Sequence, residues 1–174
     1  MQPDREPRRH PQIVNLDELA GHTMTGDAIA STMKQLGAAT RGGILGCTYY
    51  EVPPGRSGFP YHFHCVNEEA LFVLEGEATL RLGAEEVPVR AGDYVALPVG
   101  PDSAHQLLNT GAAPLRYLCL STLQPTEVAV YPDIGTVGVM AVPSLDAARR
   151  GEHWVSLMVP AGGAPATSDK DGDR

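Results

Sequence analysis

The chain has too few cysteines, too widely spaced, for disulfides or thiolate metal ligands to organise it. Its 174 residues include only Cys47, Cys65 and Cys119, and none belongs to a Cys-x-x-Cys pair. An odd number of widely separated thiols makes neither a disulfide framework nor a thiolate zinc site. We therefore expect all three cysteines to be small buried side chains in a reducing compartment.

Positive charge and long apolar stretches are scarce as well. Lys and Arg total 13 against 21 Asp and Glu, a formal net charge of -8, and the basic residues form no run beyond Arg5, Arg8 and Arg9. This negative field repels phosphates, so no nucleic-acid partner is expected. No apolar run approaches the ~20 residues of a membrane span, and none follows Arg8 and Arg9 as a secretion signal would require. The expected protein is cytoplasmic, with no membrane partner.

Short apolar segments punctuated by glycine and proline are abundant. From Gly43 onward, segments such as "ATLRLG", "EVPVRAG" and "YVALPVG" follow one another at regular spacing. Short strands between such turn residues are typical of an antiparallel sandwich or barrel, so the predicted fold class is all-β. The length suits one domain, expected at residues 13–159, while the polar, Pro- and Gly-containing ends at 1–12 and 160–174 are expected to be disordered tails.

The segments that flank this core are less regular. "DAIASTMKQLG" has an Asp N-cap and a closing Gly that fit a helix, whereas its "STMKQL" part also fits an edge strand. We expect the strand, preceded by a short turn at "NLDELAG". Beyond the core, "EVAVYPDIGTVGVMAVPS" and "HWVSLMVP" are predicted to form further strands.

Three histidines and a carboxylate form the candidate chemical centre. His62 and His64 lie two apart, so in a strand their side chains point to the same face. A carboxylate follows from Glu68 or Glu69, and His105 begins a later strand after a Pro/Gly turn. Three imidazoles and one carboxylate suit Fe(II), Mn(II), Ni(II), Co(II) or Zn(II).

These residues resemble the two sequence motifs of the cupin superfamily. The first motif matches from its histidines to its glycine: His62-x-His64, four residues, Glu69, six residues, Gly76. The second reads Gly92-x5-Pro98-x-Gly100, then His105-x3-Asn109. Two departures are loop-length changes, which strands tolerate: the glycine before the first motif is displaced, and four residues rather than two separate Gly100 from His105. The resemblance covers residues 43–122 in detail.

The resemblance implies a small single-domain cupin, a double-stranded β-helix or jelly-roll barrel whose mouth admits a small-molecule substrate. Its metal ligands would be His62, His64, Glu69 and His105, holding one divalent transition metal per chain (Fe, Mn, Ni, Co or Zn). Glu69 is preferred to Glu68 because it alone precedes Gly76 by six residues. Small cupins often associate through sheet edges, so a homodimer is expected.

Candidate pocket-lining residues come from strands beside the motifs: Tyr49, Glu51, Tyr61 and Tyr117. Tyr49 and Glu51 share one face of their strand and Tyr50 and Val52 share the other, so only one of these sets can look inward. Exposure is the favoured expectation for Glu51, and packing for the tyrosines. Asn109 is expected to close a turn through its amide.

Three functions remain open for such a chain. The first is dioxygenase-like oxidation of a small molecule at a 3-His/1-Glu Fe(II) site. The second is an isomerase or lyase, including sugar or sugar-phosphate isomerisation, with Mn, Ni or Zn. Arg81, Arg90 and Arg116 form no cluster that would cradle a phosphate, which favours oxidation. The third is a non-catalytic sensing cupin, although no helix-turn-helix pattern precedes the barrel.

Overall fold

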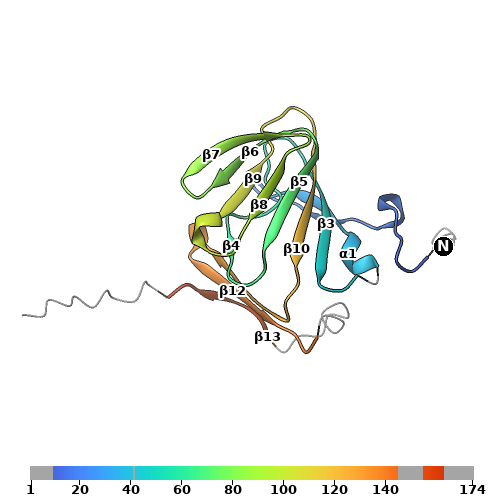
Figure 1. The fold of residues 1–174 in the computed structure, drawn as a ribbon. Coiled ribbons are helices and arrows are strands. Elements are labelled where there is room, and N and C mark those ends of the chain that lie inside the picture. Colours follow the sequence, from blue (N-terminus) through green and yellow to red (C-terminus); the bar gives the residue numbers. More distant parts are fainter. Residues whose placement is uncertain (1–9, 41, 145–154, 163–174) are drawn as a thin grey trace, which may run out of the picture.

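Antiparallel strands make up most of the described chain. The computed structural model describes residues 10–40, 42–144 and 155–162. A six-stranded sheet has the spatial order β1 (His22–Met24), β2 (Ser31–Gln35), β3 (Leu45–Val52), β10 (Leu115–Thr122), β5 (Glu69–Glu75) and β8 (Tyr94–Leu97). A four-stranded sheet contains β13 (Val155–Pro160), β12 (Thr136–Ala141), β11 (Thr126–Tyr131) and β4 (Phe63–His64), and a three-stranded sheet contains β7 (Glu85–Arg90), β6 (Glu77–Leu82) and β9 (His105–Leu108). The predicted all-β jelly roll is confirmed (Figure 1).

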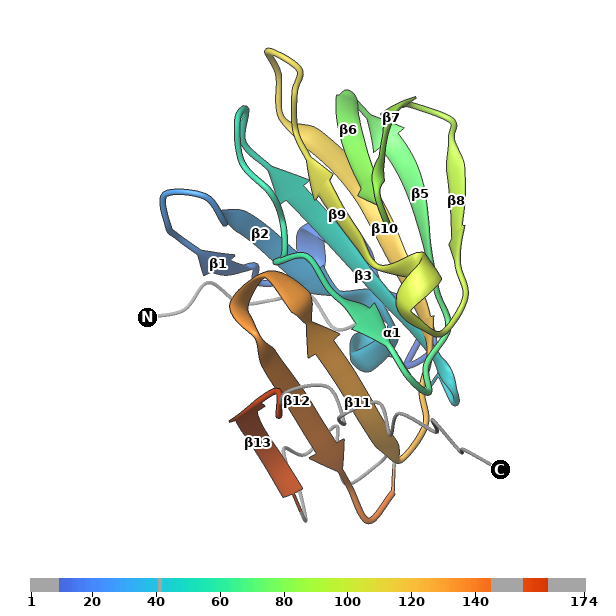
Figure 2. The ribbon, with the colours of Figure 1, turned by 90° about the vertical axis from the view of Figure 1, so that its left-hand side faces the viewer.

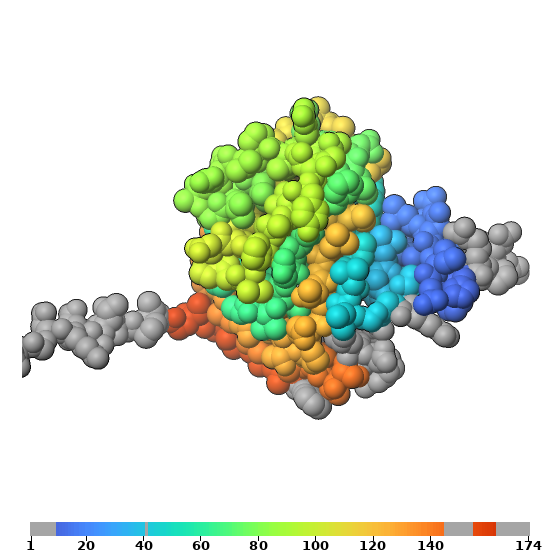
Figure 3. Space-filling view, viewed as in Figure 1, coloured from blue at the N-terminus to red at the C-terminus, as the bar shows by residue number. Residues whose placement is uncertain are grey.

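The hydrophobic core lies between the six-stranded sheet and the three-stranded sheet. On β5 the alternation is plain, because Leu71 and Val73 are buried while Phe72 and Leu74 are exposed. The buried cluster is Val52, Leu71, Val73, Ala78, Leu80, Val89, Leu97, Leu107, Leu115 and Tyr117. Figure 3 shows the opposite, outer face of β8, β5, β10 and β3 as one continuous surface. Inward-facing residues of β5 and β10 therefore determine what the barrel interior contains.

Two motif residues close turns rather than carry chemistry. Gly76, between β5 and β6, has φ +94, and a Cβ there would lie 3.1 Å from the Pro114 oxygen. Asn109 is fully buried. Its amide donates to the carbonyls of Val52 (2.8 Å) and Ala113 (2.9 Å) and accepts from the Gly111 N–H (3.0 Å). The expected turn-closing role of Asn109 is confirmed.

The flanking segments are mainly strands, as expected. β2 pairs with β3 through Thr32 and Glu51, so the helical alternative for "STMKQ" is wrong. Four residues of α-helix follow as α1 (Leu36–Ala39), and the turn near "NLDELAG" is a 3-10 helix, Leu16–Glu18. Two more 3-10 turns, Pro101–Ser103 and Pro132–Ile134, precede β9 and β12. Figure 2 shows β11, β12 and β13 side by side at one end of the barrel.

Several expectations concern residues that the structure does not describe. Residues 1–9 and 163–174, which make up most of both expected tails, lie outside the described residues. His153, the first residue of the expected strand "HWVSLMVP", also lies outside them. The boundaries 13–159 therefore stay a prediction. No helix within the described ranges is long and apolar enough to cross a membrane. Burial of all three cysteines was the wrong expectation, because Cys65 lies exposed beyond the end of the two-residue β4 and the other two are half-buried.

Candidate metal centre

Main-chain pairing brings the two histidine motifs together. His62 and His105 form an antiparallel bridge, with the His62 N–H donating to the His105 carbonyl (3.1 Å) and the reverse bond at 2.8 Å. Two residues further on, His64 pairs with Ala129 of β11. Glu69 begins β5 in the facing sheet, in phase with the inward-pointing Leu71. Long-range β pairing, rather than a continuous loop, thus sets the spacing of the four side chains.

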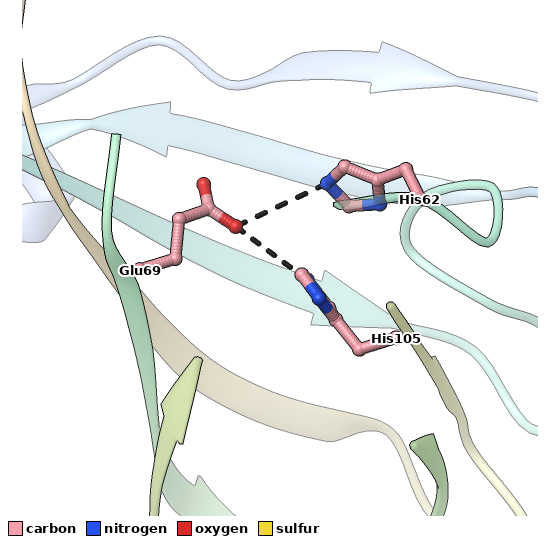
Figure 4. A group of neighbouring side chains, drawn as sticks. All are labelled: His62, Glu69 and His105. Carbon is pink, nitrogen blue, oxygen red and sulfur yellow. Dashed lines mark ion pairs between the residues drawn. The ribbon is translucent and has the colours of Figure 1, made fainter. Parts of the chain in front are cut away.

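The four polar side chains meet at one carboxylate oxygen. The Nε2 atoms of His62, His64 and His105 lie 3.9, 3.3 and 3.5 Å from Oε2 of Glu69. Figure 4 shows His62 and His105 approaching Glu69 from the opposite side of the barrel. The ligand atoms of these three residues lie within 4.8 Å of one another. One ion could touch these three residues. His64 lies outside this group, although its Nε2 faces the same carboxylate oxygen. Imidazoles with a carboxylate are a donor set for a divalent transition metal.

The second ring nitrogens determine which way two of the imidazoles present their lone pairs. Nδ1 of His62 lies 2.9 Å from the Pro60 carbonyl oxygen, and Nδ1 of His105 lies 2.9 Å from that of Ser103. A carbonyl oxygen only accepts, so each Nδ1 carries the ring proton and each Nε2 offers a lone pair to the centre. Both nitrogens of His64 are buried without a hydrogen-bond partner. Buried nitrogens that lack partners and face a carboxylate fit a metal ion.

Burial and mutual charge set the protonation of the centre. Burial lowers the pKa of His62 to about 4, and the nearby His105 and His64 add to this effect. Burial would raise the pKa of Glu69, but the nearby His105 and His64 outweigh it and lower that pKa well below 4.5. Burial would lower the pKa of His64, but the carboxylates of Glu69 and Glu127 outweigh it and raise that pKa above 6.5. At neutral pH the centre therefore has an ionised carboxylate beside a neutral His62.

Two residues that contact this quartet of candidate ligands (His62, His64, Glu69 and His105) were not predicted from the motifs. The thiol of Cys119 on β10 donates to Oε1 of Glu69 at 3.5 Å, which leaves Oε2 to face the histidines. The signal for Cys119 in the sequence is strand alternation, because it lies two residues from the candidate Tyr117. Glu127 of β11 is buried, and its Oε1 lies 3.6 Å from Nδ1 of His64. Its only sequence signal was an acidic residue within an apolar strand, "EVAVY".

A cavity of about 140 Å³ opens onto the quartet. Aromatic rings dominate its wall. Tyr50 and Tyr117 stack in parallel with centroids 4.9 Å apart, and Tyr131 stacks on the His62 ring at 5.7 Å. Among the described residues, no Lys or Arg lines it; the lining set is Tyr50, Phe59, Pro60, His62, His64, Glu69, Leu71, His105, Gln106, Leu107, Tyr117, Cys119 and Tyr131.

Of the four candidate pocket-lining residues, only Tyr117 lines this cavity. Of the two sets on β3, the one that contains Tyr50 faces the cavity, and the one that contains Tyr49 and Glu51 does not. The Tyr49 hydroxyl instead donates to Glu51 (3.2 Å). Tyr61 also points elsewhere, because it alternates with His62, and its hydroxyl donates to the Gly83 carbonyl (3.1 Å).

Comparison with known proteins identifies the family. The family model described as "Cupin domain" matches residues 48–121. The chain is 31% identical over 117 residues to the tetracenomycin polyketide synthase protein TcmJ of Streptomyces glaucescens, covering 67% of this chain and 71% of TcmJ. The chain belongs to the cupin superfamily. This cupin is also 25% identical over 135 residues to the polyketide synthase CurC of Streptomyces cyaneus, covering 77% of this chain and 81% of CurC.

A solved structure agrees with the fold. The cupin superposes with a TM-score of 0.72 on a sugar phosphate isomerase of the cupin superfamily from Silicibacter pomeroyi. The two are 24% identical, and the match covers 90% of this chain and 98% of the other. At this identity the likeness shows the shared fold, and it confirms the jelly roll that the two motifs predicted.

Proposed function

We propose that this cupin is a metal-dependent enzyme that oxidises a small oxygen-bearing molecule with O2, as a dioxygenase does. The observation that carries the proposal is the convergence of three Nε2 atoms on Glu69 Oε2, within 3.9 Å, at a cavity. His62, His64, Glu69 and His105 would hold an Fe(II) ion. Bound iron would supply the redox chemistry with O2 that side chains lack.

The protein's own residues would bind the substrate and keep water away from it. A cavity of about 140 Å³ matches the size of engineered cavities that accept a benzene molecule, so one ring or one keto-enol unit fits. Phe59 and Tyr131 offer aromatic faces beside the His62 ring. Planar, weakly polar ligands stack well on such faces.

The residues that line the cavity also favour a substrate without a phosphate group over a sugar phosphate. Phosphate recognition relies on Arg, Lys or helix N-termini, and no Lys or Arg lines the cavity in the described part of the chain. Sugar-phosphate isomerisation is therefore disfavoured for this cupin. TcmJ and CurC bear the names of polyketide synthase proteins. Polyketides carry oxygens on alternate carbons, so a small molecule with two oxygens on one conjugated unit, such as a 1,3-diketone, is the substrate class that we propose.

Metal analysis tests the first half of the proposal. Protein purified without chelator is expected to carry close to one divalent transition metal per chain by elemental analysis. The double variant His62→Ala/His64→Ala should lose it, while the matched control His22→Ala, an exposed histidine on β1, should keep it. A wild-type protein that binds no metal even after reconstitution would refute the proposal.

Oxygen consumption tests the second half. Fe(II)-loaded protein should consume O2 with catechol or a 1,3-diketone, and zinc-loaded protein should not. Cleavage of one C–C bond with both atoms of one O2 entering the product balances without a further reductant, so ¹⁸O₂ should label the product twice. Equal turnover of the loaded zinc form without O2 would instead assign an isomerase or lyase. Ligand binding with neither reaction would assign a sensing cupin.

A further inference from the structure

His64 differs from the other two histidines in what its second nitrogen faces. The Nδ1 atoms of His62 and His105 are each 2.9 Å from a backbone carbonyl, which holds the ring in one orientation. Nδ1 of His64 lies within hydrogen-bond distance of no acceptor. The acidic group it faces is the carboxylate of Glu127, at 3.6 Å. His64 thus faces a carboxylate just beyond hydrogen-bond distance, where its two counterparts face neutral carbonyl groups.

Glu127 is itself held rigidly, although it lies outside the matched cupin domain, residues 48–121. Its side chain is buried, and its oxygens accept from the N–H groups of Val66 (3.3 Å), Asn67 (2.8 Å) and Val128 (2.8 Å). Val66 and Asn67 belong to the segment that joins His64 to Glu69. A buried carboxylate with three backbone donors is costly to displace, so it is a firm support for whatever contacts it.

We propose that Glu127 is the positioning residue of the metal centre. Its carboxylate is placed to accept a hydrogen bond from the Nδ1–H group of His64, which would turn the Nε2 lone pair toward Glu69 and the ion. The same carboxylate holds the 65–68 segment, so one side chain sets the separation of two ligands, His64 and Glu69. Hydrogen bonds from a metal-bound imidazole to a carboxylate orient the ring and strengthen it as a donor, and losing them typically costs 10- to 100-fold in metal affinity.

The proposal rests on the metal site proposed above, so its test has a readout that needs no metal. Protein labelled with ¹⁵N-histidine should show slowly exchanging Nδ1–H protons for His62, His64 and His105, with the His64 signal assigned by its loss in His64→Gln. In Glu127→Gln the His64 signal should disappear or move strongly, while those of His62 and His105 stay in place. The absence of a proton on His64 Nδ1 in the wild type, or an unchanged signal in Glu127→Gln, would overturn the proposal.

Metal affinity provides the second readout, measured by competition with a chromophoric zinc chelator. Glu127→Gln should bind zinc about 10- to 100-fold more weakly than the wild type. Asn67→Ala is the matched control, because Asn67 Oδ1 holds the same segment by accepting from the Gln124 N–H (2.9 Å) but does not face His64. It should stay within about threefold of the wild type. Equal losses of zinc affinity in both variants would mean that Glu127 only holds the 65–68 segment in place, and would refute the positioning role.

The outcomes separate the two proposals. If no form of the protein binds zinc, the proposed enzyme fails, while the metal-free histidine spectra still decide whether Glu127 holds the His64 proton. If Glu127→Gln does not fold, Glu127→Asp keeps the charge and shortens the reach by one methylene. The His64 signal should then weaken selectively, and an unchanged signal would count against the proposal.

Discussion

In metal-free protein, the stability of this cupin should depend on pH, with His62 as the main cause. Burial lowers the pKa of His62 from 6.5 to about 4 in the folded protein. The unfolded chain therefore binds a proton at His62 below about pH 6.5, and the folded chain does not until about pH 4. Stability must fall as the pH falls through that window. At ~1.4 kcal/mol per pH unit, the full loss is about 3 kcal/mol, of which about 2 kcal/mol is reached by pH 4.5.

The other charged groups of the centre leave this window largely unaffected. The raised pKa of His64 contributes stability that is already complete below pH 6.5 and is lost only as the pH rises through its folded value. The lowered pKa of Glu69 contributes stability that is lost as the pH falls below about 4.5. Between pH 6.5 and 4.5, the change in the free energy of unfolding with pH therefore comes mainly from the protonation of His62.

Urea unfolding of chelator-treated protein at pH 6.5 and pH 4.5, followed by circular dichroism, measures the effect. A loss of about 2 kcal/mol is large beside the 5 to 15 kcal/mol that holds a typical domain together. His62→Gln is the control, because its neutral amide does not titrate and the pH dependence should shrink by the same amount. A wild-type free energy of unfolding that changes by less than about 0.5 kcal/mol, or an undiminished dependence in His62→Gln, would refute this reasoning.

Three further predictions concern the frame around the centre, each measured by thermal or urea unfolding. Gly76→Ala should lose about 1–2 kcal/mol, since its positive φ and the contact with Pro114 both penalise a Cβ; no loss would contradict the turn geometry. Asn109→Ala should lose about 3 kcal/mol, because three backbone groups lose a buried partner, and a loss below about 1 kcal/mol would argue against that network. Arg116→Ala should leave the unfolding midpoint unchanged, because exposed ion pairs such as that with Glu51 contribute little; a clear drop would show otherwise.

Local patterns in the sequence were enough to predict the fold class and the four side chains that converge in the structure. Short apolar runs between glycines and prolines predicted the strands, because turn geometry and the two-residue alternation act over a few residues. The count from Glu69 to Gly76 selected the glutamate that shares the inner face of β5 with Leu71, and Asn109 was recognised as a turn residue from its motif. Each of these depends on neighbours in the chain.

What the sequence alone could not decide depends on contacts between distant strands. Alternation divides β3 into two sets but does not say which set is inside, so Tyr49 and Glu51 remained candidates for the pocket, and the structure places Tyr50 there. The pairing of β3 with β10, which stacks Tyr50 on Tyr117, makes that choice.

Sequence by itself thus determined which residues are able to form a metal centre, because motif spacing and strand alternation are local. Tertiary structure decided what surrounds that centre. Glu127 stands behind His64 only because β11 pairs with β4, and the two residues are far apart in the chain. No local period encodes such a pairing, since it is selected by the burial and hydrogen bonding of the whole barrel.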